Sequence, residues 1–142
     1  MPLKPRLLIE RQPRVIAPGQ LYVVVLLDGV QYAIHARHVQ RAMLAADATG
    51  SMPVIDLRVV FGLPRRAAGP SAAVIAETPR GVASILVDAV VTLARIEDRA
   101  FVALPEIFDG GERQRFEGLA RHDGRIIPVL KTDGLISAGA AA

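Results

Sequence analysis

The chain has 142 residues, of which 51 % are hydrophobic and 22 % charged, with a net charge of +3 and no cysteine. A chain of this length fits one domain, and its apolar content excludes a wholly disordered protein because enough apolar surface can be buried to offset chain entropy. The missing cysteine excludes a disulfide framework and any thiolate metal site.

No stretch of the sequence predicts a membrane segment. The longest uninterrupted apolar run, residues 21–27, is far shorter than the roughly 20 residues that a membrane helix needs. Residues 1–6 carry charge without the apolar stretch of a signal peptide. We therefore expect a cytoplasmic protein without membrane insertion.

The positive charge is concentrated at the N-terminus. Residues 1–20 hold four basic side chains against Glu10, which leaves 17 − 4 = 13 basic and 14 − 1 = 13 acidic residues for 21–142. A nucleic-acid-binding protein is expected to carry its positive charge on the surface of the folded domain, because phosphate neutralisation supplies most of its affinity. We predict no nucleic-acid partner, and an RNA-binding β-barrel that uses the basic arm stays the less favoured alternative.

The first two elements are an arm and a hairpin. Four prolines fall within residues 1–19 and discourage both helix and sheet interior, so we predict a flexible basic arm there. Two β-rich runs, 21–27 and 30–34, then flank Asp28-Gly29, a dipeptide that tolerates the positive φ angles of a type I′ turn. This pattern predicts a β-hairpin.

The middle of the chain predicts a short helix and a strand. Within residues 36–43, Val39 and Met43 lie four apart with arginines on another side, which indicates an amphipathic helix. Residues 52–57 follow as a strand that starts at Pro53 or lies at an edge, because proline cannot donate to a ladder. We expect residues 65–70 to connect two halves of the chain, and we call this segment the seam.

The second half predicts two further hairpins. One joins 72–77 to 82–87, and the other joins 116–121 to 125–130 through a turn that contains Asp123-Gly124. Asp88 interrupts an apolar run, so we expect a bend or bulge before a strand over 89–93. The last residues, 137–142, are expected to form a tail.

Candidate reactive groups are few. His35-x-x-His38 has a spacing compatible with metal, but no cysteine or local carboxylate completes a ligand set, so we predict no metal site. The serines lack a nucleophile elbow, and the carboxylate pairs fall on polar stretches that indicate solvated surface. We expect no catalytic residue, no cofactor and no enzymatic activity.

Several segments, taken in order, resemble the CheW-like domain, the domain of chemotaxis coupling proteins. They are the opening hairpin 21–34, His38-Val39-Gln40, the segment 53–58 with Phe61-Gly62, the stretch 81–90, and the closing hairpin 116–130. The resemblance implies a mostly β fold of two SH3-like β-barrel subdomains with short helices. The CheW-like domain would cover residues 20–136, with subdomains at about 20–66 and 70–136.

The first half departs from the family pattern. Family members usually carry an Asn-Leu-Arg-Gly strand just before the Pro-Val strand, whereas here residues 43–51 fill that interval without an Arg-Gly pair. The first subdomain is therefore expected to be shortened, with either no strand in this interval or a stunted one at residues 43–46. An unpaired strand there could support a homo-oligomer.

The resemblance implies an adaptor or scaffold of chemosensory signal transduction. Its partners would be a CheA-type histidine kinase of the two-component class and, secondarily, a methyl-accepting chemoreceptor. A diverged regulator that binds the kinase without receptor coupling is the alternative. For protein binding through apolar contacts with a polar rim, the candidate residues are Val54, Asp56, Arg58, Val87, Asp88 and Leu119.

Two of these candidates have competing explanations. Arg58 could present bidentate donors to a partner carboxylate, or it could pair inside the fold with Asp56 or a helix end. Asp88 could face a partner, but capping of its own bend is the favoured interpretation. The apolar candidates could equally be core.

Overall fold

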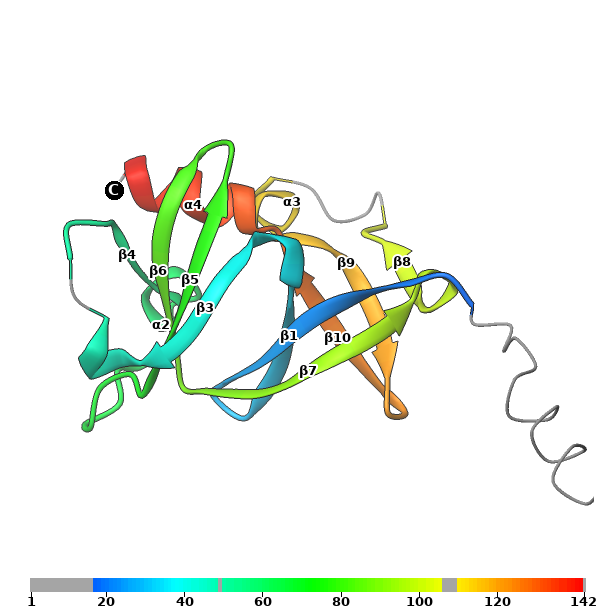
Figure 1. The fold of residues 1–142 in the computed structure, drawn as a ribbon, viewed down its shortest axis with the longest axis horizontal. Helices are drawn as coiled ribbons and strands as arrows, with labels where there is room; N and C mark the ends of the chain where they lie inside the picture. Colours follow the sequence, from blue (N-terminus) through cyan, green and yellow to red (C-terminus); the bar gives the residue numbers. More distant parts are fainter. Residues whose placement is uncertain (1–16, 49, 106–109, 142) are drawn as a thin grey trace, which may run out of the picture.

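The computed structural model describes residues 17–48, 50–105 and 110–141. Within these ranges ten strands form two sheets joined by short helices (Figure 1). The strands are β1 (Gly19–Leu27), β2 (Val30–His35), β3 (Val39–Leu44), β4 (Val54–Asp56), β5 (Ala72–Thr78), β6 (Gly81–Val87), β7 (Ala89–Glu97), β8 (Phe101–Ala103), β9 (Phe116–His122) and β10 (Arg125–Leu130). The predicted mostly β fold with short helices is confirmed.

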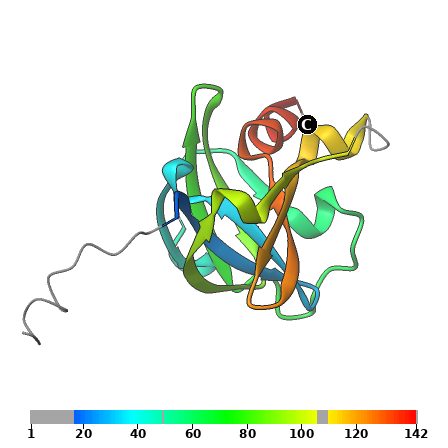
Figure 2. The ribbon, with the colours of Figure 1, turned by 90° about the vertical axis from the view of Figure 1, so that its right-hand side faces the viewer.

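The helices are short, and most of them connect strands. They are the 3₁₀ turns η1 (Ala36–His38), η2 (Ala45–Asp47) and η3 (Asp98–Ala100) and the α-helices α2 (Leu57–Val60), α3 (Gly111–Arg115) and α4 (Thr132–Ala141). Figure 2 shows α3 and α4 side by side at one end of the molecule.

The larger sheet has six strands in the order β7-β1-β2-β10-β9-β8. The predicted turn at Asp28-Gly29 joins β1 to β2, and both residues have positive φ, 53° and 78°. The turn at Asp123-Gly124 joins β9 to β10 in the same way, with φ angles of 49° and 71°. Both hairpins follow from local turn chemistry.

This sheet curls strongly along its length. Its two edge strands, β7 and β8, are joined by the three residues of η3 alone. Such a short connection forces the two edges toward each other, and the main chain of Asp98 donates to Pro18 O at 2.8 Å beside the start of β1. The sheet nevertheless stays open, because β7 does not pair with β8.

The smaller sheet has four strands in the order β3-β5-β6-β4. The predicted hairpin of β5 and β6 forms its centre, and β4 lies at an edge directly after Pro53, as expected. Residues 45–48 and 50–53, the described residues between β3 and β4, form no strand. This sheet is therefore also open.

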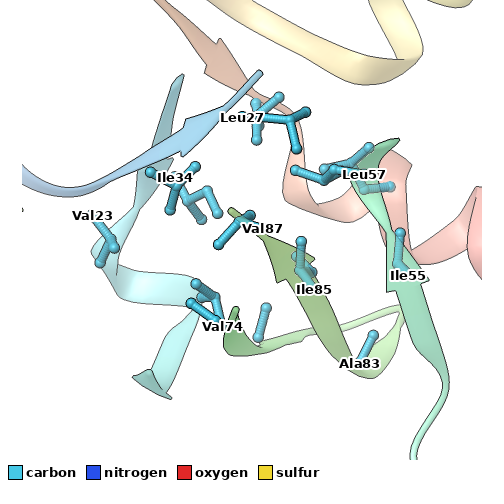
Figure 3. Packing of buried hydrophobic residues seen from close by; sticks show 14 of the residues in the cluster. Val23, Leu27, Ile34, Ile55, Leu57, Val74, Ala83, Ile85 and Val87 are labelled. Atoms are coloured by element: carbon cyan, nitrogen blue, oxygen red, sulfur yellow. The ribbon is translucent and has the colours of Figure 1, made fainter. Parts of the chain in front are cut away.

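A shared core holds the two sheets together. Val23, Leu27 and Ile34 of the first hairpin pack against Val74 and Ile85 of the second, as Figure 3 shows from close by. Leu135 and Ile136 of α4 belong to the same buried cluster. A second cluster, centred on Tyr22, Val24, Ile127 and Val129, fills the concave side of the curled sheet.

Two sequence expectations for single elements are wrong. The segment 36–43 is not a helix, because only η1 is helical and β3 pairs with β5 from Val39 onward. Residues 137–141 are not a tail, because they continue α4. Of the predicted flexible arm, residues 1–16 lie outside the described residues.

The two sheets do not follow the two halves of the sequence. β1 and β2 pair with β7 and β10, which come from the second half. β3 and β4 pair with β5 and β6 across the seam at 65–70. Each sheet is therefore built from both halves of the chain.

Candidate functional site

Arg58 and Asp88 form a buried ion pair between two distant segments. Arg58 lies in α2, and Asp88 lies at the predicted bend between β6 and β7. The guanidinium donates from Nε to Asp88 Oδ1 at 2.9 Å and from Nη2 to Asp88 Oδ2 at 2.7 Å. Only 10 % of the Arg58 side chain and 9 % of the Asp88 side chain are exposed.

Asp28 adds the first hairpin turn to this cluster. Its main-chain N–H donates to Asp88 Oδ2 at 2.8 Å, and its own carboxylate lies 3.4 Å from Arg58 Nη2. The main-chain N–H of Asp88 donates in turn to Leu26 O at 3.0 Å. Asp28, Arg58 and Asp88, each thirty residues from the next, thus join the two sheets at one point.

The charges in this cluster stabilise each other. Hydrogen bonding from Arg58 lowers the pKa of Asp88, with a further contribution from the Asp28 N–H. The hydrogen bond to Asp88 likewise raises the pKa of Arg58. Arg58 Nη1 donates to Pro64 O at 2.6 Å, so all three nitrogens of the guanidinium have partners inside the fold.

This geometry decides between the explanations offered for Arg58 and Asp88. Arg58 pairs within the fold, but its partner is Asp88, and Asp56 instead accepts the Arg58 main-chain N–H at 3.0 Å as the N-cap of α2. Asp88 is held by Arg58 and the Asp28 N–H, which the sequence interpretation did not foresee. The two residues lie too far apart in sequence for a local pattern to connect them.

The apolar candidates are scattered. Val54 is 61 % exposed on the edge strand β4, beside Asp56. Val87 is 1 % exposed and points into the shared core, so a partner cannot reach it in this conformation. Leu119 is half-buried on β9 of the other sheet. The structure brings together Asp56, Arg58 and Asp88, and it leaves Leu119 apart from them.

The two histidines are close but differ in environment. Their ring centroids are 6.1 Å apart; His35 is buried at the end of β2, whereas His38 is partly exposed. His35 Nδ1 accepts the Arg37 N–H at 3.0 Å, and Nε2 faces Gln20 Oε1. The described residues contain no group of three or more side chains that could hold a metal ion.

Sequence reasoning missed an exposed apolar surface on β7. Val91 and Leu93 of this edge strand and Leu21 of the adjoining β1 are exposed, and Leu93 reaches 60 %. We call these three residues the β7 surface. The apolar run itself predicts a strand, and exposure of these side chains follows only from the position of β7 at the edge of the sheet. Exposed apolar clusters of this kind are typical of protein-binding sites.

The fold and these surfaces define a β-rich binding module of two packed sheets, in which a charged cluster fixes the framework and apolar side chains face outward. No helix among the described residues is long and apolar enough to cross a membrane.

Comparison with known proteins gives the family. The CheW-like domain family matches residues 49–140, more than half of the chain, and the chain belongs to this family. A curated relative, the "Probable chemotaxis protein CheW" of Rhizobium etli, is 33 % identical over 89 residues, which cover 61 % of this chain. The alignment spans only 56 % of that relative's length.

A solved structure supports the same fold. The scaffolding protein TtCheW from Thermoanaerobacter tengcongensis superimposes with a TM-score of 0.65 at 24 % identity. The match covers 80 % of this chain and 89 % of the other. At this identity the match establishes the fold alone.

Proposed function

We propose that this chain is a coupling scaffold of chemosensory signalling that docks the regulatory domain of a CheA-type histidine kinase in the cytoplasm. Membership of the CheW-like domain family is the observation that carries the proposal. The name of the Rhizobium etli relative, a probable chemotaxis protein, supports the same pathway.

Docking of this kind requires an apolar patch with a polar rim and no reactive group. The β7 surface provides three exposed aliphatic side chains on one sheet edge. Val54 and Asp56 on the edge strand β4 offer a second, smaller contact. Arg58 and Asp88 would act indirectly, because they hold the bend from which β7 starts.

The test is a calorimetric titration of the full chain with the regulatory domain of the CheA-type kinase from the same organism. We expect a dissociation constant below about 100 μM, which corresponds to roughly 5.5 kcal/mol of binding free energy. Leu93→Glu should weaken binding by about tenfold or more, because it places a charge in the apolar contact. Absence of detectable binding by the unmodified chain would overturn the proposal.

Ile126→Glu is the matched control for that substitution. Ile126 is 70 % exposed on β10, which is separated from β7 by β1 and β2 in the same sheet. The two variants add the same charge to similarly exposed aliphatic positions. Equal weakening by both would show that the β7 surface is not the docking site.

A second candidate role is kinase binding without receptor coupling. The observation that favours it is the interval between β3 and β4, where the described residues 45–48 and 50–53 form no strand. Family members usually carry an Asn-Leu-Arg-Gly strand in this interval. Expression of this chain in a coupling-protein deletion strain tests it. Restored receptor-dependent kinase activation would favour full coupling, whereas kinase binding without activation would favour the narrower role.

A further inference from the structure

β3 forms an outer edge of the smaller sheet. Among the described residues it pairs on one side only, with β5. The main chain of Ala45 donates to Ser71 O at 3.0 Å just beyond the last residue of β3. Because hydrogen-bonded pairs alternate along an antiparallel ladder, the N–H and C=O groups of Ala42 and Leu44 point away from β5. Both residues are exposed, and outward main-chain groups of this kind can pair with the edge of another sheet.

A groove lies along one face of this edge. It has a volume of about 430 Å³ and runs between β3 and the start of β7, where Ala42 and Leu44 face Val90. Leu44 is 65 % exposed there. Ser71 and Asp88 are the polar members of the lining, and the Asp88 side chain is only 9 % exposed because both of its carboxylate oxygens accept hydrogen bonds from the guanidinium of α2. The accessible part of the groove is therefore mainly aliphatic.

The opposite face of the edge carries charge. Arg41 and Met43 line a cavity of about 70 Å³ that Asp47 of η2 lines as well. The positive charge of Arg41 thus has a carboxylate of the same chain in its surroundings. A strand that pairs with β3 needs no acidic side chain on this face, provided that it places no cation opposite Arg41.

We propose that this strand is β3 of a second copy of the chain, paired antiparallel about a two-fold axis through Met43. In this register Ala42 lies opposite the second copy's Leu44, and their outward main-chain groups bond in both directions. Each exposed leucine then covers a small alanine beside the groove of the other copy. Arg41 lies opposite Ala45, so the two arginines do not face each other. The two four-stranded sheets would form one continuous sheet of eight strands.

Other registers fit this edge less well. An axis at Ala42 would pair Leu44 with Gln40, where the ladder between β3 and β5 is irregular. An axis at Leu44 would pair Ala42 with Ala46, which belongs to η2 and not to the strand. An axis between two residues would oppose outward groups to groups that face β5. Met43 is the axis at which residues of β3 alone supply all the hydrogen bonds.

Single cysteines test this register in the full chain, which has no native cysteine. Met43→Cys places two thiols on the axis in a non-hydrogen-bonded pair, whose Cα separation of about 4.5 Å suits a disulfide. Arg41→Cys is the matched control, because it lies on the same face and its two copies would be roughly 13 Å apart along the strands. Under mild oxidation Met43→Cys should form a disulfide-linked dimer about tenfold faster than Arg41→Cys. Equal rates would overturn the proposal.

Reversible association gives a second readout that is independent of cysteine chemistry. Sedimentation equilibrium of the unmodified chain should show a dimer at about 100 μM, and a chain that stays monomeric there would contradict the proposal. Leu44→Glu should raise the dissociation constant of the dimer about tenfold or more, because it places a carboxylate in the groove that holds the second copy's Asp88.

Val54→Glu is the control for that variant. Val54 is 61 % exposed on β4, at the far edge of the same sheet, so the substitution adds the same charge away from the proposed contact. Equal weakening of the dimer by both variants would show that β3 is not the interface. Neither measurement involves the kinase, so self-association can fail while the proposed function stands.

Discussion

Asp88 is the residue on which the charged cluster depends. It accepts two hydrogen bonds from Arg58 and one from the Asp28 N–H. Asp88→Asn keeps the shape but leaves the buried guanidinium with only the Asp28 carboxylate, 3.4 Å from Nη2, as a counter-charge. We expect the melting temperature at pH 7 to fall by about 5 °C or more. Asp123→Asn, a change at an exposed hairpin turn, is the control and should have little effect.

The pH dependence of this difference follows from the lowered pKa of Asp88. A carboxyl whose pKa is lower in the folded state contributes stability above its ordinary pKa of about 3.9 and loses it as the pH falls through the folded value. The difference in stability between the native chain and the Asp88→Asn variant should therefore disappear below about pH 4. Urea midpoints measured from pH 7 to pH 2.5 will show this, and a constant gap would contradict it.

We expect His35 to make the fold sensitive to mild acid. Burial lowers its pKa, with smaller contributions from Arg37 and His38. Its Nδ1 must stay unprotonated, because it accepts the Arg37 N–H. A histidine with a lowered folded pKa costs stability as the pH falls below its ordinary value of about 6.5. The urea midpoint should thus decline from pH 7 to pH 5, and His35→Gln should remove most of that slope.

Elements that a local sequence pattern determines could be predicted, whereas elements that depend on a distant partner strand could not. The hairpins at Asp28-Gly29 and Asp123-Gly124 follow from dipeptides that accept positive φ, which the sequence displays directly. Residues 39–44 have a helical spacing of apolar side chains, yet they form β3 because β5 offers a strand to pair with. No local pattern in the sequence reports that partner.

The C-terminal helix was missed for the opposite reason. Its last residues are alanine and glycine, a composition that carries no amphipathic signal. Leu135 and Ile136, in the first half of α4, pack in the shared core and anchor the helix. Packing of one apolar turn thus stabilises the whole helix, although the composition of its last residues is typical of a tail.

Gly118 controls how the edge strand β8 attaches to its sheet. A Cβ at this position would overlap with Val102 O and lie 2.8 Å from Phe101 Cζ. Gly118→Ala should therefore push β8 away from β9 and lower the free energy of unfolding by about 1–3 kcal/mol. Val102→Ala, an exposed change on β8 itself, should cost much less. Equal denaturation midpoints for the two variants would contradict this account.

At the scale of the whole molecule, the sequence halves and the structural units differ. The resemblance implies two subdomains at about 20–66 and 70–136, but the strands pair across the halves in both sheets. The Arg58–Asp88 pair also crosses the seam at 65–70. Interactions over such separations depend on the completed fold. Arg58 and Asp88 were therefore predicted from sequence as separate candidates, Asp28 was predicted only as a turn residue, and the cluster itself was not predicted.

This interleaving predicts that the two halves cannot fold apart. A fragment of residues 1–68 would lose the pairing of β1 with β7 and the partners of β3 and β4. A fragment of residues 69–142 would lose the partner of β7 and the pairing of β10 with β2. Each fragment alone should show no cooperative thermal transition, because most of its apolar surface would stay exposed. Mixing the two should restore the β-sheet circular dichroism signal and a single transition. If either fragment unfolded cooperatively by itself, that half would be an autonomous subdomain, and the pairing across the halves would be secondary to its stability.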